Sequence, residues 1–465
     1  MTNSTIIKPI LKLAIPLILI QLCQASLGIV DAMVAGQYNY KDLAAVGLGS
    51  AIWTPVFLFF TGVLYVFVPK FAALNNTVDT NNADANNIYH GNTHIAAQKL
   101  FLHAKNVAFW LSIIGFVIIE LLAFSVTWFI QDDEVSLITR NYLMFVGLGM
   151  PGIIHMLMYR ITGEGNSTLK PIVLVSFLLV IMNACLNVIF IHGFLGFPEM
   201  GGMGCGLATA VSGYIACMFL KKQITQQLPW VASAGHSVSG NNVSVDKQDS
   251  KRLLIEGLPI GFSFLLEVMA LTVLAFLIST YSIRHIAAHQ IVLNITLIAF
   301  MIPVAIANAT TIRIAYFNGI ADASNAAKVA IFTLLVTVVY ATIMAALLVV
   351  YDDKIVGYFT NDDGVKEIAT ILMTYGAAFQ FFSAMQMLIS GVLRGFEDFV
   401  KPLLVILINY WLFIVPVVIL SIKFNWIMRL RVEDIWLLMV VGLAVSSFVL
   451  AIVCRRKFKH IQLGS

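Results

Sequence analysis

Three carboxylates lie well inside long apolar stretches of the chain: Asp31, Glu120 and Glu267. An ionisable side chain at the middle of a bilayer costs ~2.5–3.5 kcal/mol to insert, so it usually faces a cavity and marks the path of an ion or a proton. Each residue also has a structural interpretation. Asp31 could reach the membrane surface from the end of its helix, and Glu267 could be a carboxyl group hydrogen-bonded in the packing. For Glu120, packing and function are equally supported.

Two asparagines offer uncharged oxygens on one helical face, because Asn183 and Asn187 are four residues apart. Amide oxygens can contact a sodium ion, but polar side chains also hold membrane helices together. Both interpretations stay open for this pair. His289 and Gln290 lie early in another apolar stretch, where a lone histidine is more typical of a structural hydrogen bond than of a titrating group.

The chain carries none of the short motifs that mark common catalytic or nucleotide sites. It contains no HExxH, GxSxG or P-loop pattern, and its five cysteines form no CxxC pair. We therefore predict that the protein is not an enzyme and uses no cofactor. Uphill transport would then draw on an ion gradient, since one proton moved across ~100 mV gains about 2.3 kcal/mol.

The composition shows whether the elements that position these residues lie in water or in lipid. Of 465 residues, 60% are hydrophobic and only 11% are charged, and the mean hydropathy is +0.90. Soluble domains carry about 25% charged residues. Lys and Arg exceed Asp and Glu by only 28 − 24 = 4, which is too few for a nucleic-acid-binding face. The sequence predicts a polytopic membrane protein whose partner is the lipid bilayer.

Twelve apolar stretches are long enough to cross the bilayer, which takes about 20 residues of helix. They are continuous rather than alternating, which predicts an all-α fold and not a barrel. The predicted spans are 10–34, 44–72, 105–130, 136–159, 171–192, 202–220, 253–280, 286–315, 328–350, 367–393, 402–421 and 434–454.

The basic residues predict the orientation of these spans. With the N-terminus inside, most Lys and Arg fall in inner segments, and acidic clusters such as Asp132–Asp133–Glu134 and Asp362–Asp363 fall outside. This asymmetry follows the positive-inside rule. We expect both termini to be cytoplasmic and the chain to be a multi-pass protein of a cell membrane, the inner membrane of a bacterium.

The chain also contains an internal repeat. At an offset of 259 − 16 = 243 residues, the first two spans align without a gap onto the seventh and eighth. Pro16 then falls on Pro259, and Lys70 falls on Arg313. The same offset over two spans, with prolines and a cation in register, indicates duplication.

The repeat predicts two six-helix lobes. The N-terminal lobe comprises residues 1–221, a polar cytoplasmic linker covers 222–250, and the C-terminal lobe comprises 251–465. An even number of spans keeps the two lobes in the same orientation, as in transporters built from parallel repeats. Such bundles around a shared cavity suit alternating access.

Nine widely spaced motifs resemble those of the MATE (multidrug and toxic compound extrusion) transporters, and most closely their NorM branch. The resemblance covers nearly the whole chain. The motifs are KLAIP at 12–16, VDAMVAG at 30–36, LAAV at 43–46, WTP at 53–55, LNVIF at 186–190, MGGMGCGLAT at 200–209, GLPI at 257–260, AHQI at 288–291 and GVLRGF at 391–396.

The resemblance implies a monomeric antiporter that exports cationic, amphipathic drugs in exchange for Na+ or H+. The alternative within the same superfamily is a flippase for lipid-linked oligosaccharides. Such a protein is expected to line its cavity with Arg and Lys, whereas the basic residues here lie mostly at the ends of spans.

The resemblance also implies roles for particular residues. Asp31 and Glu267 match the family's two coupling carboxylates and would be the ligands of a bound Na+. The implied coupling cluster further includes Asn183, Asn187, Thr209 and Ser383, and the implied drug-binding residues are Asp31, Gln290, Gln386, Asp362 and Asp363.

One position departs from the NorM pattern. An aspartate usually stands three residues before the glutamine of the tenth span, but here Ser383 precedes Gln386. A serine offers a neutral oxygen and no charge. We therefore expect weaker sodium binding at Glu267 and more of the coupling at Asp31, or coupling through protons at Glu267.

Overall fold

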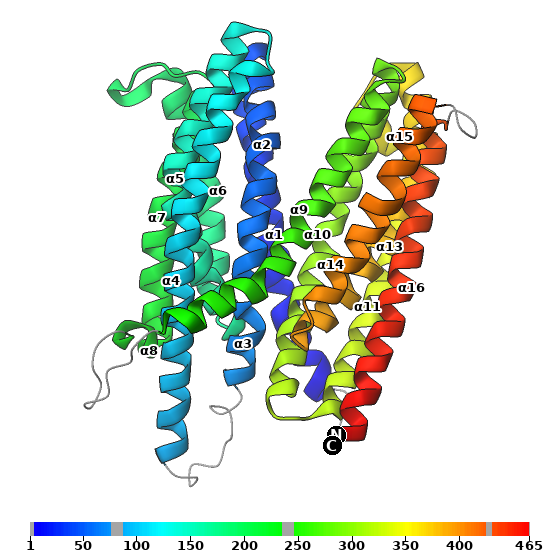
Figure 1. The fold of residues 1–465 in the computed structure, drawn as a ribbon. Coiled ribbons are helices and arrows are strands. Elements are labelled where there is room, and N and C mark those ends of the chain that lie inside the picture. Colours follow the sequence, from blue (N-terminus) through cyan, green and yellow to red (C-terminus); the bar gives the residue numbers. More distant parts are fainter. Residues whose placement is uncertain (1–3, 76–86, 235–245, 425–429, 465) are drawn as a thin grey trace. The chain divides into compact units, whose positions relative to one another are not determined.

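The computed structural model describes residues 4–75, 87–234, 246–424 and 430–464, and the regular elements in these ranges are all helical (Figure 1). Within these ranges, twelve helical stretches are long and apolar enough to cross a membrane, which confirms the predicted all-α fold with twelve spans. Several helices extend beyond the predicted spans, because backbone hydrogen bonds continue into polar residues that hydropathy does not count.

The described residues form two compact units. The first unit comprises Leu19–Phe262, and the second comprises the residues up to Ile18 together with those from Ser263 onward. The boundaries fall inside α1 (Ser4–Tyr38) and α9 (Lys247–Ser279), so each of these helices contributes to both units. The predicted lobe boundaries stay a prediction.

The first unit also contains α2 (Tyr40–Tyr65), α3 (Phe67–Leu74), α4 (Asn87–Ser125), η2 (Val126–Trp128), α5 (Asp133–Gly165), α6 (Lys170–His192), η3 (Phe194–Gly196), α7 (Met203–Gln227) and α8 (Pro229–Ser233). The second unit also contains α10 (Ile283–Gly319), α11 (Ala323–Val350), α12 (Asp352–Gly357), α13 (Asp363–Gly395), α14 (Val400–Ile406), η4 (Leu407–Ile414), α15 (Val415–Phe424) and α16 (Val432–Gly464).

Each unit is built around one central helix. In the first unit α5 packs against α2, α4 and α7, and in the second unit α13 packs against α10, α11 and α16. These two helices are the least apolar of the twelve spans and the most buried. Low hydropathy and high burial go together here, because a helix surrounded by other helices need not present an apolar face to lipid on every side.

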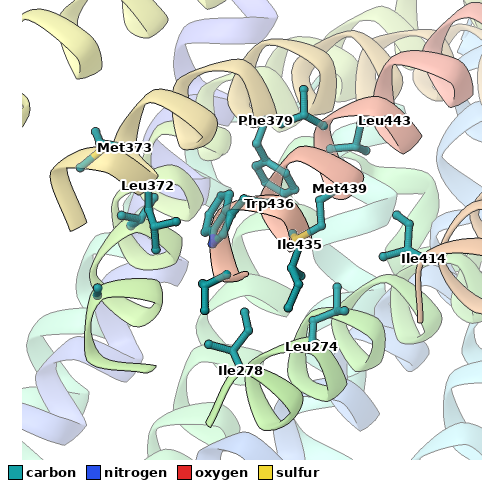
Figure 2. Packing of buried hydrophobic residues seen from close by; sticks show 14 of the residues in the cluster. Leu274, Ile278, Leu372, Met373, Phe379, Ile414, Ile435, Trp436, Met439 and Leu443 are labelled. Atoms are coloured by element: carbon teal, nitrogen blue, oxygen red, sulfur yellow. The ribbon is translucent and has the colours of Figure 1, made fainter. Parts of the chain in front are cut away.

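Buried apolar side chains from every helix between α9 and α16 fill the core of the second unit (Figure 2). Trp436 of α16 is fully buried, and the ring of Phe379 on α13 packs edge-on against it at 5.7 Å between centroids. Leu274 and Ile278 of α9 belong to the same cluster. The second part of α9 is thereby fixed to α13 and α16.

A π-helical turn interrupts the eleventh span just before a proline. The backbone N–H of Val415 donates to the carbonyl of Tyr410, five residues earlier. Pro416 follows at once, and its ring would clash with the carbonyl four residues before it in a regular α-helix. The wider turn relieves that clash and sets the position of Tyr410, which is buried.

Glycines let α9 approach α2 closely within the first unit. A Cβ atom on Gly257 would lie 2.3 Å from the carbonyl oxygen of Val63, and one on Gly62 would lie 2.6 Å from the Cα of Gly261. An ion pair joins α9 to the adjoining α3, since Lys70 Nζ lies 2.9 Å from Glu256 Oε2. Small residues at such a crossing allow backbones to touch in membrane helices.

The part of the predicted linker that the structure describes is mostly helical. The sixth span runs on to Gln227, α8 follows, and α9 begins at Lys247. The Trp230 ring of α8 lies 6.2 Å from the ring of Phe101, and Gln98 donates to the Ser233 hydroxyl at 2.9 Å. Residues 235–245 of this linker lie outside the described residues.

Asp132 caps the first turn of α5. Its Oδ1 accepts the backbone N–H groups of Glu134 and Val135, both at 3.0 Å. These hydrogen bonds, that of Val135 foremost, together with the nearby Lys41 ammonium, hold the pKa of Asp132 below its ordinary value. Lys41 also pairs with Glu134, so this cap joins the start of α2 to the start of α5.

Candidate functional site

Asp31 lies within a buried polar cluster of the first unit. It occupies α1 two turns before the helix ends, and only 5% of the residue is exposed. The Asn187 amide donates to Asp31 Oδ1 at 2.7 Å and to Asn183 Oδ1 at 3.2 Å. Asn183 in turn donates to the Thr209 hydroxyl at 3.4 Å. The structure therefore brings together the four predicted coupling residues of this half, and Asp31 is buried among them.

Glycines at the start of α7 bring Thr209 to this cluster. A Cβ atom on Gly204 would lie 2.9 Å from the carbonyl carbon of Phe190, and one on Gly206 would lie 2.4 Å from the Tyr142 carbonyl oxygen. Only glycine permits both approaches, because the obstacles are backbone atoms. The closely spaced glycines of the MGGMGCG motif thus bring α7 against α5 and α6.

Tyr142 is a member of this cluster that sequence reasoning missed. It is 1% exposed, it lies close enough to Asp31 for an electrostatic interaction, and its hydroxyl is 3.3 Å from that of Ser50. Its ring fills the space over Gly49, where a Cβ would lie 2.4 Å away. A tyrosine in an apolar span gives no sequence signal of its own. The one sequence feature that accompanies this contact is Gly49 of α2, which leaves room for the Tyr142 ring.

One oxygen in the cluster has no partner. Among the described residues, Asn187 Oδ1 is buried without a hydrogen bond, beside the Asp31 carboxylate. A carboxylate next to an unpaired amide oxygen is a donor set that a hard cation such as Na+ accepts. No group of three or more His, Cys, Asp or Glu side chains suited to a metal ion occurs in the part of the chain that the structure describes. With a single carboxylate and neutral amide oxygens, the Asp31 cluster suits one small monovalent cation or a proton.

Glu267 lies in a different environment in the second unit. It is partly exposed on α9, and the Arg394 guanidinium and the Tyr410 hydroxyl both lie close enough to interact with it electrostatically. Arg394 is 5.6 Å from the centroid of the Phe264 ring, one turn before Glu267, and donates to the Ser390 carbonyl at 3.3 Å. The sequence placed Arg394 among the basic residues at the inner ends of spans and within the GVLRGF motif, without a contact to Glu267.

No hydrogen bond joins the other predicted residues of the second unit to Glu267 in the described part of the chain. Ser383 and Gln386 are buried on α13, and neither forms a hydrogen bond with Glu267 among the described residues. Gln290 is exposed near the start of α10. The drug-binding roles of Gln290 and Gln386 and the coupling role of Ser383 stay predictions.

Asp362 and Asp363, both predicted to bind drug, lie at the start of α13, and Asp362 also has a structural role there. Asp362 caps α13 by accepting the backbone N–H of Val365 at 2.8 Å, and Arg284 Nε lies 3.4 Å from its carboxylate. Asp363 is exposed in the first turn of the same helix. Its charge is therefore more available to a soluble cation than that of Asp362.

Glu120 stands apart from both clusters. Its Oε1 lies against Gly147 of α5, where a Cβ would be 2.6 Å away. Within the described ranges it forms neither a hydrogen bond nor an ion pair. The glycine leaves room for the carboxyl group, so this residue packs at the α4–α5 contact rather than joining the Asp31 cluster.

The sequence matches proteins of known type over nearly its whole length. A family model described as MatE matches residues 16–67 and 259–420, and these segments begin at the two prolines paired by the internal repeat. The chain is 30% identical over 452 residues to the multidrug resistance protein MdtK of Pectobacterium atrosepticum, covering 97% of this chain and 95% of that protein. It is 28% identical over 453 residues to the probable multidrug resistance protein NorM of Mannheimia succiniciproducens, covering 95% and 92%.

Solved structures show the same fold. An outward-facing conformation of a multidrug resistance MATE family transporter of the MOP superfamily superposes with a TM-score of 0.80. The match covers 98% of this chain and 97% of that chain, at 18% sequence identity.

Proposed function

Because the chain belongs to the MATE family of multidrug transporters, we propose that it is an antiporter that exports cationic, amphipathic compounds in exchange for Na+ or H+ by alternating access. The protein is a multi-pass membrane transporter of the multidrug efflux type, and it is not an enzyme. Its coupling to an ion and its alternation between two facings are what we propose beyond that.

The observation that carries the proposal is the Asp31 cluster. The carboxylate is buried, it accepts a hydrogen bond from Asn187 at 2.7 Å, and the same amide leaves one oxygen unpaired. A proton or a sodium ion at this position neutralises the charge that a cationic drug would otherwise contact. Because one carboxylate cannot satisfy both cations at once, their binding is mutually exclusive, and this exclusion is what an exchanger requires.

Coupling at Glu267 is the secondary part of the proposal. The Arg394 guanidinium near Glu267 supplies a positive charge that opposes the binding of a further cation there. Ser383 adds no second carboxylate. We therefore assign the main coupling step to Asp31 and a modulating role to Glu267.

The distribution of basic residues supports a topology for this transporter. We propose that it lies in a bacterial inner membrane with both termini cytoplasmic and that it works as a monomer. The positive-inside rule supports the orientation. Two variants test this orientation: Tyr358→Cys, at an exposed position after α12, and Lys221→Cys. A thiol reagent added outside intact cells should label only the cysteine at position 358.

Export of a fluorescent cation in everted vesicles tests the coupling. Asp31→Asn should abolish export against the gradient at normal expression, and Glu267→Gln should lower it. Glu120→Gln is the matched control, because it changes a carboxylate within a span that lacks the amide partner. If Asp31→Asn still exchanges drug against the gradient, the coupling role is wrong. Repeating the assay with and without Na+ identifies the ion.

A further inference from the structure

A side-chain hydrogen bond joins the π-helical turn of the eleventh span to α9 next to Glu267. The indole N–H of Trp411, in η4, donates to the backbone carbonyl of Leu266 at 3.0 Å. Leu266 is the residue directly before Glu267, and both lie in α9. The two partners are 145 residues apart in the chain, and both belong to the second unit. The hydrogen bond therefore holds the backbone of α9 at the level of the carboxylate.

The residue before Trp411 in the same turn lies beside Glu267 itself. Tyr410 is 1% exposed, and its hydroxyl is close enough to Glu267 for an electrostatic interaction. Consecutive side chains of a helix point in different directions, but a π-turn holds more residues than an α-turn, so the angle between them is smaller. The turn thus presents two consecutive side chains to two consecutive residues of α9.

Pro416 accounts for this local geometry. Its ring excludes a regular α-helix here, and the Val415 N–H donates to Tyr410, five residues back instead of four. Turns of this kind are rare and frequently occur at functional sites. Among the described residues, no other span contains one. The turn therefore marks the place where the eleventh span meets Glu267.

Apolar packing at this place is not enough to fix the rotation of α9. Leu274 of α9 and Ile414 of η4 belong to the apolar cluster of the second unit, and Leu266 and Trp411 pack against it (Figure 2). Apolar contacts are non-directional, whereas a hydrogen bond requires its donor to point at its acceptor. The indole N–H therefore adds a directional contact between η4 and α9.

We propose that Trp411 is a positioning residue for Glu267. Its hydrogen bond to Leu266 sets the rotation of α9, so that the carboxylate stays beside the Arg394 guanidinium and the Tyr410 hydroxyl. The guanidinium opposes the binding of a further cation, so a contact that keeps the carboxylate beside it weakens the binding of the coupling ion at Glu267. This inference rests on the modulating role that the proposed function gives to Glu267.

Nuclear magnetic resonance of the full chain in micelles tests the contact without transport. The chain has seven tryptophans, and the indole signal that Trp411→Phe removes is that of Trp411. In wild type this N–H should exchange slowly with deuterated water. Pro416→Ala keeps the indole but permits a regular α-helix, so exchange should become about 3- to 10-fold faster, the range that one neutral hydrogen bond supplies. Equal exchange in Pro416→Ala and wild type would overturn the positioning by the π-turn.

Export of a fluorescent cation from everted vesicles tests the consequence. Trp411→Phe keeps an apolar ring but loses the N–H, and it should lower the coupling-ion concentration at half-maximal export about 3- to 10-fold. Trp436→Phe is the matched control, because its indole N–H has no hydrogen-bond partner among the described residues and the same ring is replaced in the same unit. It should leave that concentration unchanged even where it lowers the free energy of unfolding.

A double variant separates positioning from a general structural role. If Trp411 acts through Glu267, Trp411→Phe should change nothing further in a chain that already carries Glu267→Gln. A shift of the same size in both backgrounds would overturn the proposal, as would an unchanged half-maximal concentration in Trp411→Phe alone. If Glu267→Gln alone keeps the wild-type ion dependence, the role of Glu267 in the proposed function fails, and this inference fails with it.

Discussion

Replacing Gly257 by alanine should separate α9 from α2. The added Cβ would lie 2.3 Å from the Val63 carbonyl oxygen, whereas real contacts of this kind do not fall below 3.0 Å. The backbones must therefore part by 3.0 − 2.3, or about 0.7 Å. The obstacle is a backbone carbonyl that cannot rotate away, and overpacking of this type costs ~1–3 kcal/mol.

Gly47→Ala is the matched control for this contact. Gly47 lies in α2, and nothing stands within 4 Å of its Cβ position. Both substitutions gain about 1 kcal/mol of helix propensity, so the difference between the two variants isolates the contact. Unfolding titrations in mixed micelles should give Gly257→Ala a free energy of unfolding ~1–3 kcal/mol below that of Gly47→Ala. Equal stability of the two variants would refute the close approach of the two helices.

Three further outcomes are expected. Asn187→Leu removes a hydrogen bond to the Asp31 carboxylate worth ~1.5–3 kcal/mol, so export of a fluorescent cation from everted vesicles should fall at least about 10-fold; export at the wild-type rate would contradict it. Lys70→Gln breaks the pair with Glu256 and should lower the free energy of unfolding by up to ~1 kcal/mol in a salt-sensitive way, and an effect that ignores salt would argue against an ion pair. Asp132→Ala should destabilise the protein at neutral pH. A carboxyl group whose pKa is lowered in the folded state stabilises the protein at pH values above its ordinary pKa of 3.8, and this contribution is lost as the pH falls through the folded-state pKa. The free energies of unfolding of the variant and of wild type should therefore become equal in acid.

Hydropathy was sufficient to predict the twelve spans, because a bilayer imposes one length and one polarity on every helix that crosses it. It also singled out Asp31, since a carboxylate in such a stretch stands against a uniform background. The motif resemblance brought Asn183, Asn187 and Thr209 to the same cluster, and the structure joins all three to Asp31 through hydrogen bonds.

Partners across helix crossings could not be predicted in the same way. Lys70 was visible as the repeat counterpart of Arg313, but its ion-pair partner Glu256 depends on which helix crosses α3. Tyr142 and Arg394 were missed for the same reason. An apolar sequence fixes how far a helix runs along the membrane normal, whereas its neighbours depend on the shapes of small and large side chains taken together.

The places where the two units divide α1 and α9 bear on the history of the chain. The first unit ends at Phe262, and the second resumes at Ser263, while the corresponding division in α1 falls between Ile18 and Leu19. Subtracting the repeat offset gives 262 − 243 = 19, so the two divisions agree to one residue. In each half of the sequence, the first part of the first helix therefore belongs to the unit formed mainly by the other half. An ancestral six-helix chain with this arrangement would have been an arm-exchanged homodimer, and a present-day chain cut within the linker should function only when both pieces are made together.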